Sequence, residues 1–152
     1  MRTLQFSSIL PVSYRDELER IVFFNPEQER VTGPLLDSVR RYGVPGIFED
    51  GGLLRFRVPA FGAIQSLFAF DQSDQPARLV GVVMFVRESP ETMLLLHLAV
   101  HEEYVGDGRC ADAWVAPRLV AAVRAACRRT RGIKRLRMLY PREAQVRLDS
   151  AG

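Results

Sequence analysis

Cysteine is scarce in this 152-residue chain, and long hydrophobic runs are absent. The two cysteines, Cys110 and Cys127, are too few for a disulfide framework and match no zinc-ligand spacing. The longest apolar runs, 79–86 and 93–100, are each about half as long as a membrane-spanning helix. The first ten residues lack the features of an export signal. We therefore expect reduced thiols, a cytoplasmic location, no metal site and no membrane as a partner.

Internal repeats, low-complexity tracts and linker-like segments are also missing, so residues 1–152 are expected to form a single domain. Hydrophobic residues make up 47% of the chain and charged residues 26%, which is typical of a soluble globular protein. A domain of this length buries roughly 70% of the surface that its unfolded chain exposes. It therefore needs neither disulfides nor a structural metal to be stable.

Lysine is nearly absent, and the positive charge is unevenly distributed along the chain. Lys134 is the only lysine among 21 basic residues. Residues 1–107 carry 10 basic and 15 acidic side chains, a net charge of −5, whereas residues 108–152 carry 11 and 3, a net charge of +8. Clustered basic charge can bind nucleic acid. This segment has no interleaved aromatic side chains and no known nucleic-acid motif, so we do not favour nucleic acid as a partner.

The first third of the chain is expected to contain one strand and several helices. Weak alternation around Leu4 predicts the strand. A helix is predicted over 13–24, with Ser13 as its N-cap. Pro26 and the segment 35–42 predict two further short helices.

Apolar alternation and polar turns predict an antiparallel sheet in the middle of the chain. Its expected strands are 54–58, 66–70, 78–86 and 93–100. The last strand is apolar throughout, which suits a strand covered on both faces.

From Pro117 onward, apolar residues recur at the spacing of an amphipathic helix and form an apolar stripe. A strand over 133–140 follows this helix. Such a strand–helix–strand crossover implies parallel pairing with 93–100. We therefore expect an α/β (α+β) fold, with a mixed, mainly antiparallel sheet flanked by helices on both faces.

The end of the strand 93–100 is the part of the sequence most informative about function. The strand runs into the loop HEEYVGDG, residues 101–108, which leads toward the predicted helix. A loop of this kind places backbone amides and a helix dipole where an anion such as pyrophosphate binds.

Residues 98–108, LAVHEEYVGDG, resemble a stretch of the GNAT superfamily of N-acetyltransferases, in which an apolar strand ending in Ala-Val is followed by Pro-Glu-Tyr-Arg-Gly-x-Gly. The order of the expected elements is similar too, over roughly residues 1–140. The resemblance implies a shortened GNAT-like domain. It also implies acetyl-coenzyme A or another acyl-coenzyme A as cosubstrate, and a small-molecule or peptide amine as acceptor.

The same resemblance implies which residues bind the coenzyme. Its pantetheine arm would pair with the backbone of the strand end, at Leu98, Val100 and His101. Amides of the loop would hold its pyrophosphate, at Gly106, Asp107, Gly108, Arg109 and Cys110. The arginines of the following helix would suit its phosphates.

The chain departs from the family pattern in the loop and at its end. Where the family has Gln or Arg, then Gly, then Gly or Ala, this chain has Val105, Gly108 and Cys110, so only the middle position is kept. The 12 residues after Tyr140 leave room for one short strand, at 145–148, and not for the family's next helix and terminal strand pair. An unpaired sheet edge would result, so we expect a homodimer that covers it.

Three residues are candidates for catalysis: Glu102, His97 and Tyr140. Either histidine, His97 or His101, could deprotonate an amine before the amine attacks a thioester. The alternative is that His97 is a core histidine and that His101 is a surface residue at the strand end. Glu102 is slightly preferred to Glu103 as a base, against the alternative that both lie in a solvated turn. Tyr140 is included because it lies near the predicted site; the family's catalytic tyrosine has no matching residue here.

Two other residues have competing interpretations. For Cys110, a small loop residue is favoured over a nucleophile, because no base is evident beside it. Trp114 could cover an adenine ring or pack against the core or loop, and packing is favoured. The sequence as a whole predicts an N-acyltransferase that uses an acyl-coenzyme A. The alternative is a non-catalytic GNAT-like module that binds coenzyme A or a protein partner.

Overall fold

The computed structural model of the chain describes residues 2–23, 41–138 and 144–147. A six-stranded sheet contains, in spatial order, β1 (Leu4–Ser7), β5 (Gln65–Asp71), β6 (Arg78–Ser89), β7 (Thr92–Val100), β8 (Arg135–Met138) and β9 (Ala144–Arg147). A smaller sheet contains β2 (Gly46–Asp50), β3 (Leu53–Val58) and β4 (Gly62–Ala63). The helices are α1 (Arg15–Phe23) and α3 (Val115–Arg129), with short 3-10 helices η1 (Val12–Tyr14), η3 (Glu102–Tyr104) and η4 (Ala111–Ala113).

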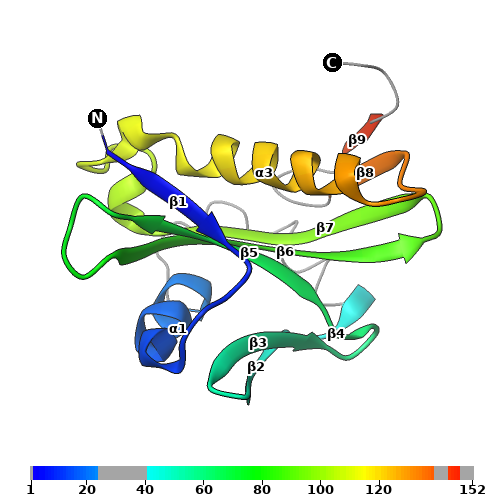
Figure 1. Cartoon of the computed structure of the whole chain (residues 1–152), viewed down its shortest axis with the longest axis horizontal. Helices are drawn as coiled ribbons and strands as arrows, with labels where there is room; N and C mark the ends of the chain where they lie inside the picture. Colours follow the sequence, from blue (N-terminus) through cyan, green and yellow to red (C-terminus); the bar gives the residue numbers. More distant parts are fainter. Residues whose placement is uncertain (1, 24–40, 139–143, 148–152) are drawn as a thin grey trace.

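The elements form three layers (Figure 1). α3 covers one face of the six-stranded sheet, and α1 and the small sheet cover the other. Neighbouring strands of the large sheet are antiparallel except β7 and β8, which are parallel. The predicted fold class is therefore confirmed. Among the described residues, no helix combines the length and the hydropathy that crossing a bilayer requires.

β7 is buried along its whole length because both faces of the sheet are covered. Between the sheet and α3, the core contains Leu95, Leu98, Val115, Leu119 and Val123, among others. Between the sheet and the layer of α1 and β3, it contains Leu18, Ile21, Leu54, Phe56 and Leu96. Each face of the central strand thus packs against its own set of apolar side chains.

A β-bulge in β7 decides which face its last residues occupy. The register of β7 against β6 skips Leu96, which is the extra residue of the bulge. Leu95 and Leu98 consequently both belong to the core on the α3 side. Ala99 lies on the α1 side, and His101, two residues further along, faces a cavity on that same side.

The start of α3 differs from the prediction. The helix begins at Val115, two residues before Pro117. Pro117 is the third helical residue, where an amide would lack an intrahelical partner and the missing N–H is tolerated. Gly81 of β6 allows the helix to come close, because a Cβ there would lie 2.9 Å from both Leu119 Cδ1 and Val115 Cγ1.

The start of α1 also differs from the prediction. The turn begins as η1, so Ser13 lies within a 3-10 helix and is not the N-cap of α1. The preceding segment is bound to the small sheet, since the Leu54 N–H donates to the Leu10 carbonyl at 2.8 Å. The helices predicted at Pro26 and over 35–42 lie outside the described residues, except that residues 41 and 42 are helical.

The expected short strand near the end of the chain is present as β9. It pairs antiparallel with β8, from Arg135–Arg147 to Met138–Ala144. β8 therefore has a neighbour on each side. Among the described residues, β9 is in turn the outer strand on this side of the sheet, and the homodimer that would cover this edge stays a prediction.

Candidate active site

The predicted functional segment lies where β7 leaves the sheet. His101 follows β7 directly and is the N-cap of η3. A turn containing Gly106, with φ of +56°, then leads through η4 to Trp114 and α3. The loop therefore lies between the end of the most buried strand and the start of the longest described helix.

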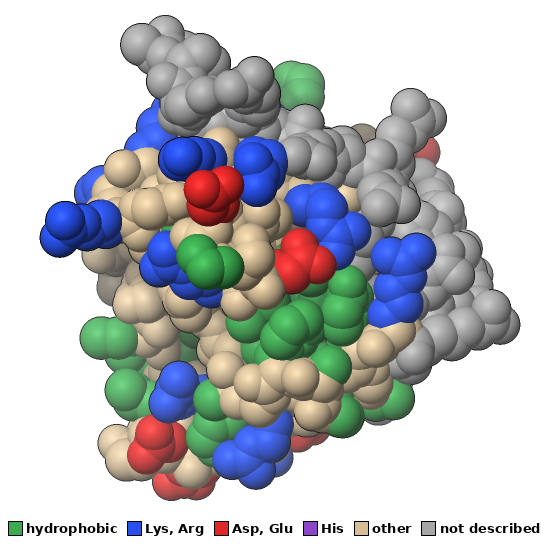
Figure 2. All heavy atoms as spheres, turned by 90° about the vertical axis from the view of Figure 1, so that its right-hand side faces the viewer, with side chains coloured by type: hydrophobic (Ala, Val, Ile, Leu, Met, Phe, Trp, Pro, Cys, Tyr) green, Lys and Arg blue, Asp and Glu red, His purple; other side chains and the backbone are tan. Residues whose placement is uncertain are grey.

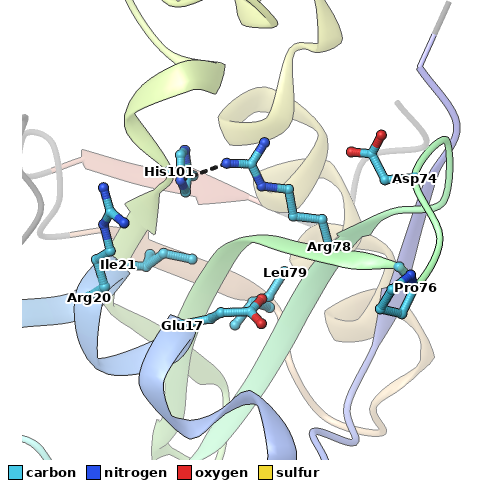
Figure 3. A pocket seen from close by; sticks show the side chains of 9 residues that line it. Glu17, Arg20, Ile21, Asp74, Pro76, Arg78, Leu79 and His101 are labelled. Atoms are coloured by element: carbon cyan, nitrogen blue, oxygen red, sulfur yellow. Dashed lines mark hydrogen bonds between the residues drawn. The ribbon is translucent and has the colours of Figure 1, made fainter.

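A cavity of about 290 Å³ opens beside this strand end, on the α1 side of the sheet (Figure 3). Three parts of the chain build it: α1, the turn and first residues from β5 into β6, and His101. Its lining residues are Glu17, Arg20, Ile21, Asp74, Pro76, Ala77, Arg78, Leu79 and His101. We refer to it as the α1 cavity. Of the predicted site residues that the structure describes, His101 alone lies in its wall.

Both ring nitrogens of His101 face N–H donors. The Glu103 amide donates to Nδ1 at 3.1 Å, and Nη2 of Arg78 lies 3.1 Å from Nε2. A neutral imidazole has one acceptor nitrogen, so the ring accepts one of these hydrogen bonds at a time. A protonated ring would accept neither, and both of its N–H groups would point at other donors.

The pKa of His101 is therefore lowered. Burial is the largest cause and the Arg78 charge the next, and together they outweigh the opposing effect of Glu103 and Glu102. The ring is neutral at neutral pH. It can accept a proton once a ligand in the cavity offers one to Nε2.

The acidic side chains after His101 hold arginines at the rim of the cavity. Glu103 binds Arg78 at 2.9 Å and Arg109 at 3.1 Å, and these contacts lower the pKa of Glu103. Glu102, the predicted base, binds Arg20 of α1 at 3.2 Å. Its side chain is 39% exposed. In this arrangement Glu102 connects the loop to α1 and lies outside the cavity wall.

A buried carboxylate at the end of β5 forms a hydrogen bond with η3. Asp71, at the end of β5, is fully buried and accepts a hydrogen bond from the Tyr104 hydroxyl at 2.6 Å. It also accepts from the Ser73 amide and pairs with Arg2 at 3.2 Å. Burial alone would raise the pKa of Asp71, but these partners more than offset it, and the pKa is lowered. The same contact and burial raise the pKa of Tyr104.

Two of the predicted phosphate-binding amides are used within the loop. The Gly108 N–H donates to the Val105 carbonyl at 2.8 Å, and the Cys110 N–H donates to the Glu103 carbonyl at 2.7 Å. Gly108 is required by packing, because a Cβ there would overlap the Glu103 carbonyl. The Cys110 side chain is buried in the core, consistent with a structural role.

Other groups in this region could hold a phosphate. The side chain of Arg109 is 72% exposed. Trp114, the N-cap of α3, makes no side-chain cap hydrogen bond, so the first-turn amides of Val115 and Ala116 carry the partial positive charge of the helix dipole. Gly106 and Asp107 lie in the intervening turn. A diphosphate would therefore bind nearer to α3 than the family pattern implies.

The peptide groups at the end of β7 alternate in direction. The His101 N–H donates to the Val80 carbonyl at 2.8 Å, so it is used within the sheet. The peptide groups of Leu98 and Val100 point the opposite way, toward the β8 side of β7. These two residues are oriented as pairing with a pantetheine arm requires, whereas the His101 amide is not.

The other predicted residues lie away from the α1 cavity or outside the described chain. His97 is 4% exposed within β7, and burial lowers its pKa to about 4. Tyr140 lies outside the described residues. Trp114 is 66% exposed, so the packing interpretation of this residue is wrong.

The basic segment is partly neutralised by acidic residues of the β6–β7 turn. Arg135 and Lys134 both pair with Glu91, at 3.3 and 3.4 Å, and Arg137 pairs with Glu88. Figure 2 shows this end of the molecule, with red acidic side chains among the blue basic ones and hydrophobic side chains beside them. The charge of this segment therefore has local partners within the fold.

A second cavity, of about 390 Å³, lies at the other end of β5. Its wall includes Ser66, Arg55 of β3 and Arg129 of α3. It is larger than the α1 cavity, but its described lining includes no histidine and none of the predicted site residues. The α1 cavity is therefore the stronger candidate for a reaction.

Sequence reasoning missed most of the α1 cavity. The sequence places Glu17 and Arg20 in a predicted helix and Arg78 at the start of a predicted strand, with no pattern that brings them together. They come together through contacts between distant segments, such as Arg20 with Glu102, 82 residues apart. The polar turn before Arg78 was the one available signal, since it placed charged residues at a strand end.

No protein-family model and no curated protein matches the chain. Among solved structures, an acetyltransferase from Streptococcus agalactiae 2603 aligns over 89% of this chain and 71% of its own, with 10% sequence identity and a TM-score of 0.36. A likeness at this level carries no argument about reaction or ligands. The proposal below therefore depends on the site itself.

Proposed function

We propose that the protein transfers an acyl group from an acyl-coenzyme A to an amine. The observation that carries the proposal is the position of His101. It lies at the end of the central strand, on the wall of a cavity, with its pKa lowered by burial and by the Arg78 charge. A neutral imidazole in such a place can serve as a general base.

The chain would contribute binding and proton transfer. The amine enters the α1 cavity as its ammonium form and loses a proton to Nε2 of His101. The ring then carries its other hydrogen on Nδ1, so this tautomer gives up the hydrogen bond from the Glu103 amide, and Arg78 gives way to the amine at Nε2. The amine nitrogen attacks the thioester carbonyl carbon. As the C–S bond breaks, the nitrogen loses its second proton, the sulfur leaves as a thiolate that takes up a proton, and the proton on Nε2 passes to solvent. Holding the two reactants in place supplies much of the rate.

The coenzyme would lie along the β8 side of β7 and near the start of α3. Leu98 would offer backbone groups to its arm. Arg109 and the first turn of α3 would bind its phosphates. The order of elements and the segment 98–108 resemble the GNAT superfamily, which supports this placement.

Calorimetry with acetyl-coenzyme A, followed by a thiol-release assay with a panel of amines, tests the proposal. We expect saturable binding and turnover with at least one amine. Absence of binding at millimolar ligand would overturn the proposal. Binding without turnover across the panel would select the non-catalytic module in its place.

The variant His101→Asn isolates the role of the ring. Its amide oxygen can still accept the Glu103 N–H, so η3 keeps its N-cap, but it has no titrating nitrogen. We expect unchanged coenzyme binding and a kcat lowered by about 10²- to 10⁴-fold. A kcat within a few-fold of the parent would exclude His101 as the base.

A further inference from the structure

The charges around the α1 cavity point to the class of amine that it takes. We infer that it binds a compact cationic amine without a carboxylate group, and that Glu17 is the counter-ion of the ammonium. Acylation of the bound amine rests on the proposed function, whereas binding of the amine does not.

Most charges in the wall are already paired. Arg20 binds Glu102 at 3.2 Å, and Arg78 binds Glu103 at 2.9 Å. Asp74 lies 3.6 Å from Arg2. Glu17 differs from these lining residues, because no ion-pair partner of its carboxylate exists among the described residues.

An unpaired carboxylate at a cavity wall attracts a cation, since an opposite charge within about 4–6 Å stabilises both charged forms. In Figure 3, Glu17 and Arg20 extend from α1, while His101 and Arg78 lie above them. A cation bound to Glu17 therefore lies on the side of the cavity opposite the Arg78–His101 pair. The Glu17 carboxylate and the neutral His101 imidazole thus line the same cavity.

The size and the walls of the cavity limit the rest of the ligand. A volume of about 290 Å³ is at the lower end of the range for small-molecule sites. The uncharged part of the wall consists of Ile21, Pro76, Ala77 and Leu79. A short alkyl or single-ring body fits these apolar side chains.

A carboxylate on the ligand would be disfavoured. Both lining arginines already bind a glutamate, so a ligand carboxylate would have to displace Glu102 or Glu103 from its partner. It would also share the cavity with the carboxylates of Glu17 and Asp74, and nearby like charges repel. Amines should therefore bind better than the corresponding amino acids.

Matched pairs of ligands test this inference on the protein without coenzyme. We would titrate tyramine against tyrosine and phenethylamine against phenylalanine, following the amide signals of α1 and the His101 ring signals by NMR. We expect each amine to bind at least about tenfold more tightly than its amino acid. Equal affinities within a pair, or no amine binding at tens of millimolar, would overturn the inference.

The variant Glu17→Gln tests the counter-ion, with Glu19→Gln as its matched control. Both residues lie on α1, but Glu19 pairs with Arg15 at 3.1 Å and does not line the cavity. We expect amine affinity to fall roughly 10- to 100-fold in Glu17→Gln and to stay unchanged in Glu19→Gln. An equal loss in both variants, or no loss in Glu17→Gln, would exclude Glu17 as the counter-ion.

The outcomes also separate this inference from the proposed function. Amine binding that depends on Glu17, without any turnover, keeps the cation site and excludes acyl transfer. Turnover with an acyl-coenzyme A whose KM for the amine is the same in Glu17→Gln keeps acyl transfer and excludes the cation site.

Discussion

Nη2 of Arg78 lies 3.1 Å from Nε2 of His101, while the Glu103 amide points at the other ring nitrogen. A positive charge on this ring would be next to a guanidinium and between two N–H groups. Arg78 is itself fixed by its ion pair with Glu103. Burial lowers the pKa of His101 most, and the neighbouring Arg78 charge lowers it further, so the ring stays neutral.

Removing the guanidinium should raise the pKa of His101. In Arg78→Gln the repulsion from the Arg78 charge is lost, while burial of the ring is largely retained. NMR titration of the ring protons measures the effect, and the two histidines are distinguishable because the pKa of His97 is about 4. The control Arg15→Gln, which changes an exposed arginine outside the cavity wall, should leave the His101 pKa unchanged. A lower or identical His101 pKa in Arg78→Gln would contradict the assigned cause.

The hydrogen bond from Tyr104 to Asp71 should stabilise the fold in a pH-dependent manner. Tyr104→Phe removes a donor to a buried carboxylate and should lower the free energy of unfolding by about 2 kcal/mol at pH 7. The folded-state pKa of Asp71 is lowered, so its contribution is present above the ordinary aspartate pKa and is lost as pH falls through the folded value. The difference between parent and variant should therefore shrink on acidification.

Tyr14→Phe is the matched control for this prediction. The Tyr14 hydroxyl donates to the neutral Ala77 carbonyl at 2.8 Å, so its loss should lower the free energy of unfolding by about 1 kcal/mol without pH dependence. Urea denaturation between pH 3 and pH 7 measures both variants. Parallel pH profiles for Tyr104→Phe and the parent would show that Asp71 is not the group responsible.

The main layers of the fold were predictable because apolar residues recur in their sequences at clear helical or strand spacing. The apolar stripe of α3 includes Leu119, Val123 and Cys127, all buried as the helical spacing implies. The run 93–100 is apolar throughout and forms the fully buried β7. The sequence predicts only part of the small sheet, because apolar and polar residues alternate clearly in β3 but not in β2 or β4.

The side of the sheet that His101 faces was not predictable, for a physical reason. A bulge at Leu96 shifts the alternation of β7, and a strand that is buried on both faces does not alternate between apolar and polar side chains, so its sequence does not reveal such a shift. The α1 cavity was hidden for a similar reason. Its charged residues come from separate elements, and their sequence neighbours show no common pattern.

The loop after β7 should depend on Gly108 for its shape rather than for ligand binding. In Gly108→Ala the new Cβ would overlap the Glu103 carbonyl, so the backbone must shift, and the free energy of unfolding should fall by about 1–3 kcal/mol. Gly46→Ala is the control, because its Cβ would lie 3.9 Å from the Arg57 carbonyl, an ordinary contact. Chemical denaturation should show Gly46→Ala as stable as the parent. An equally stable Gly108→Ala would mean that the loop tolerates a side chain there.

Trp114 occupies a strained position that a glycine should relieve. Its φ of 56° and ψ of 46° are left-handed, a conformation that raises the energy of a residue with a Cβ by roughly 1–2 kcal/mol. Its side chain is 66% exposed, so truncation removes little buried surface. Trp114→Gly should therefore be about 1 kcal/mol more stable than Trp114→Ala, which keeps the Cβ and the strain. Circular dichroism during urea unfolding compares the two variants, since the chain has a single tryptophan and both variants lose its fluorescence. Equal stabilities would indicate that the chain leaves the left-handed conformation once the indole is gone, so that the indole, rather than the loop, imposes it.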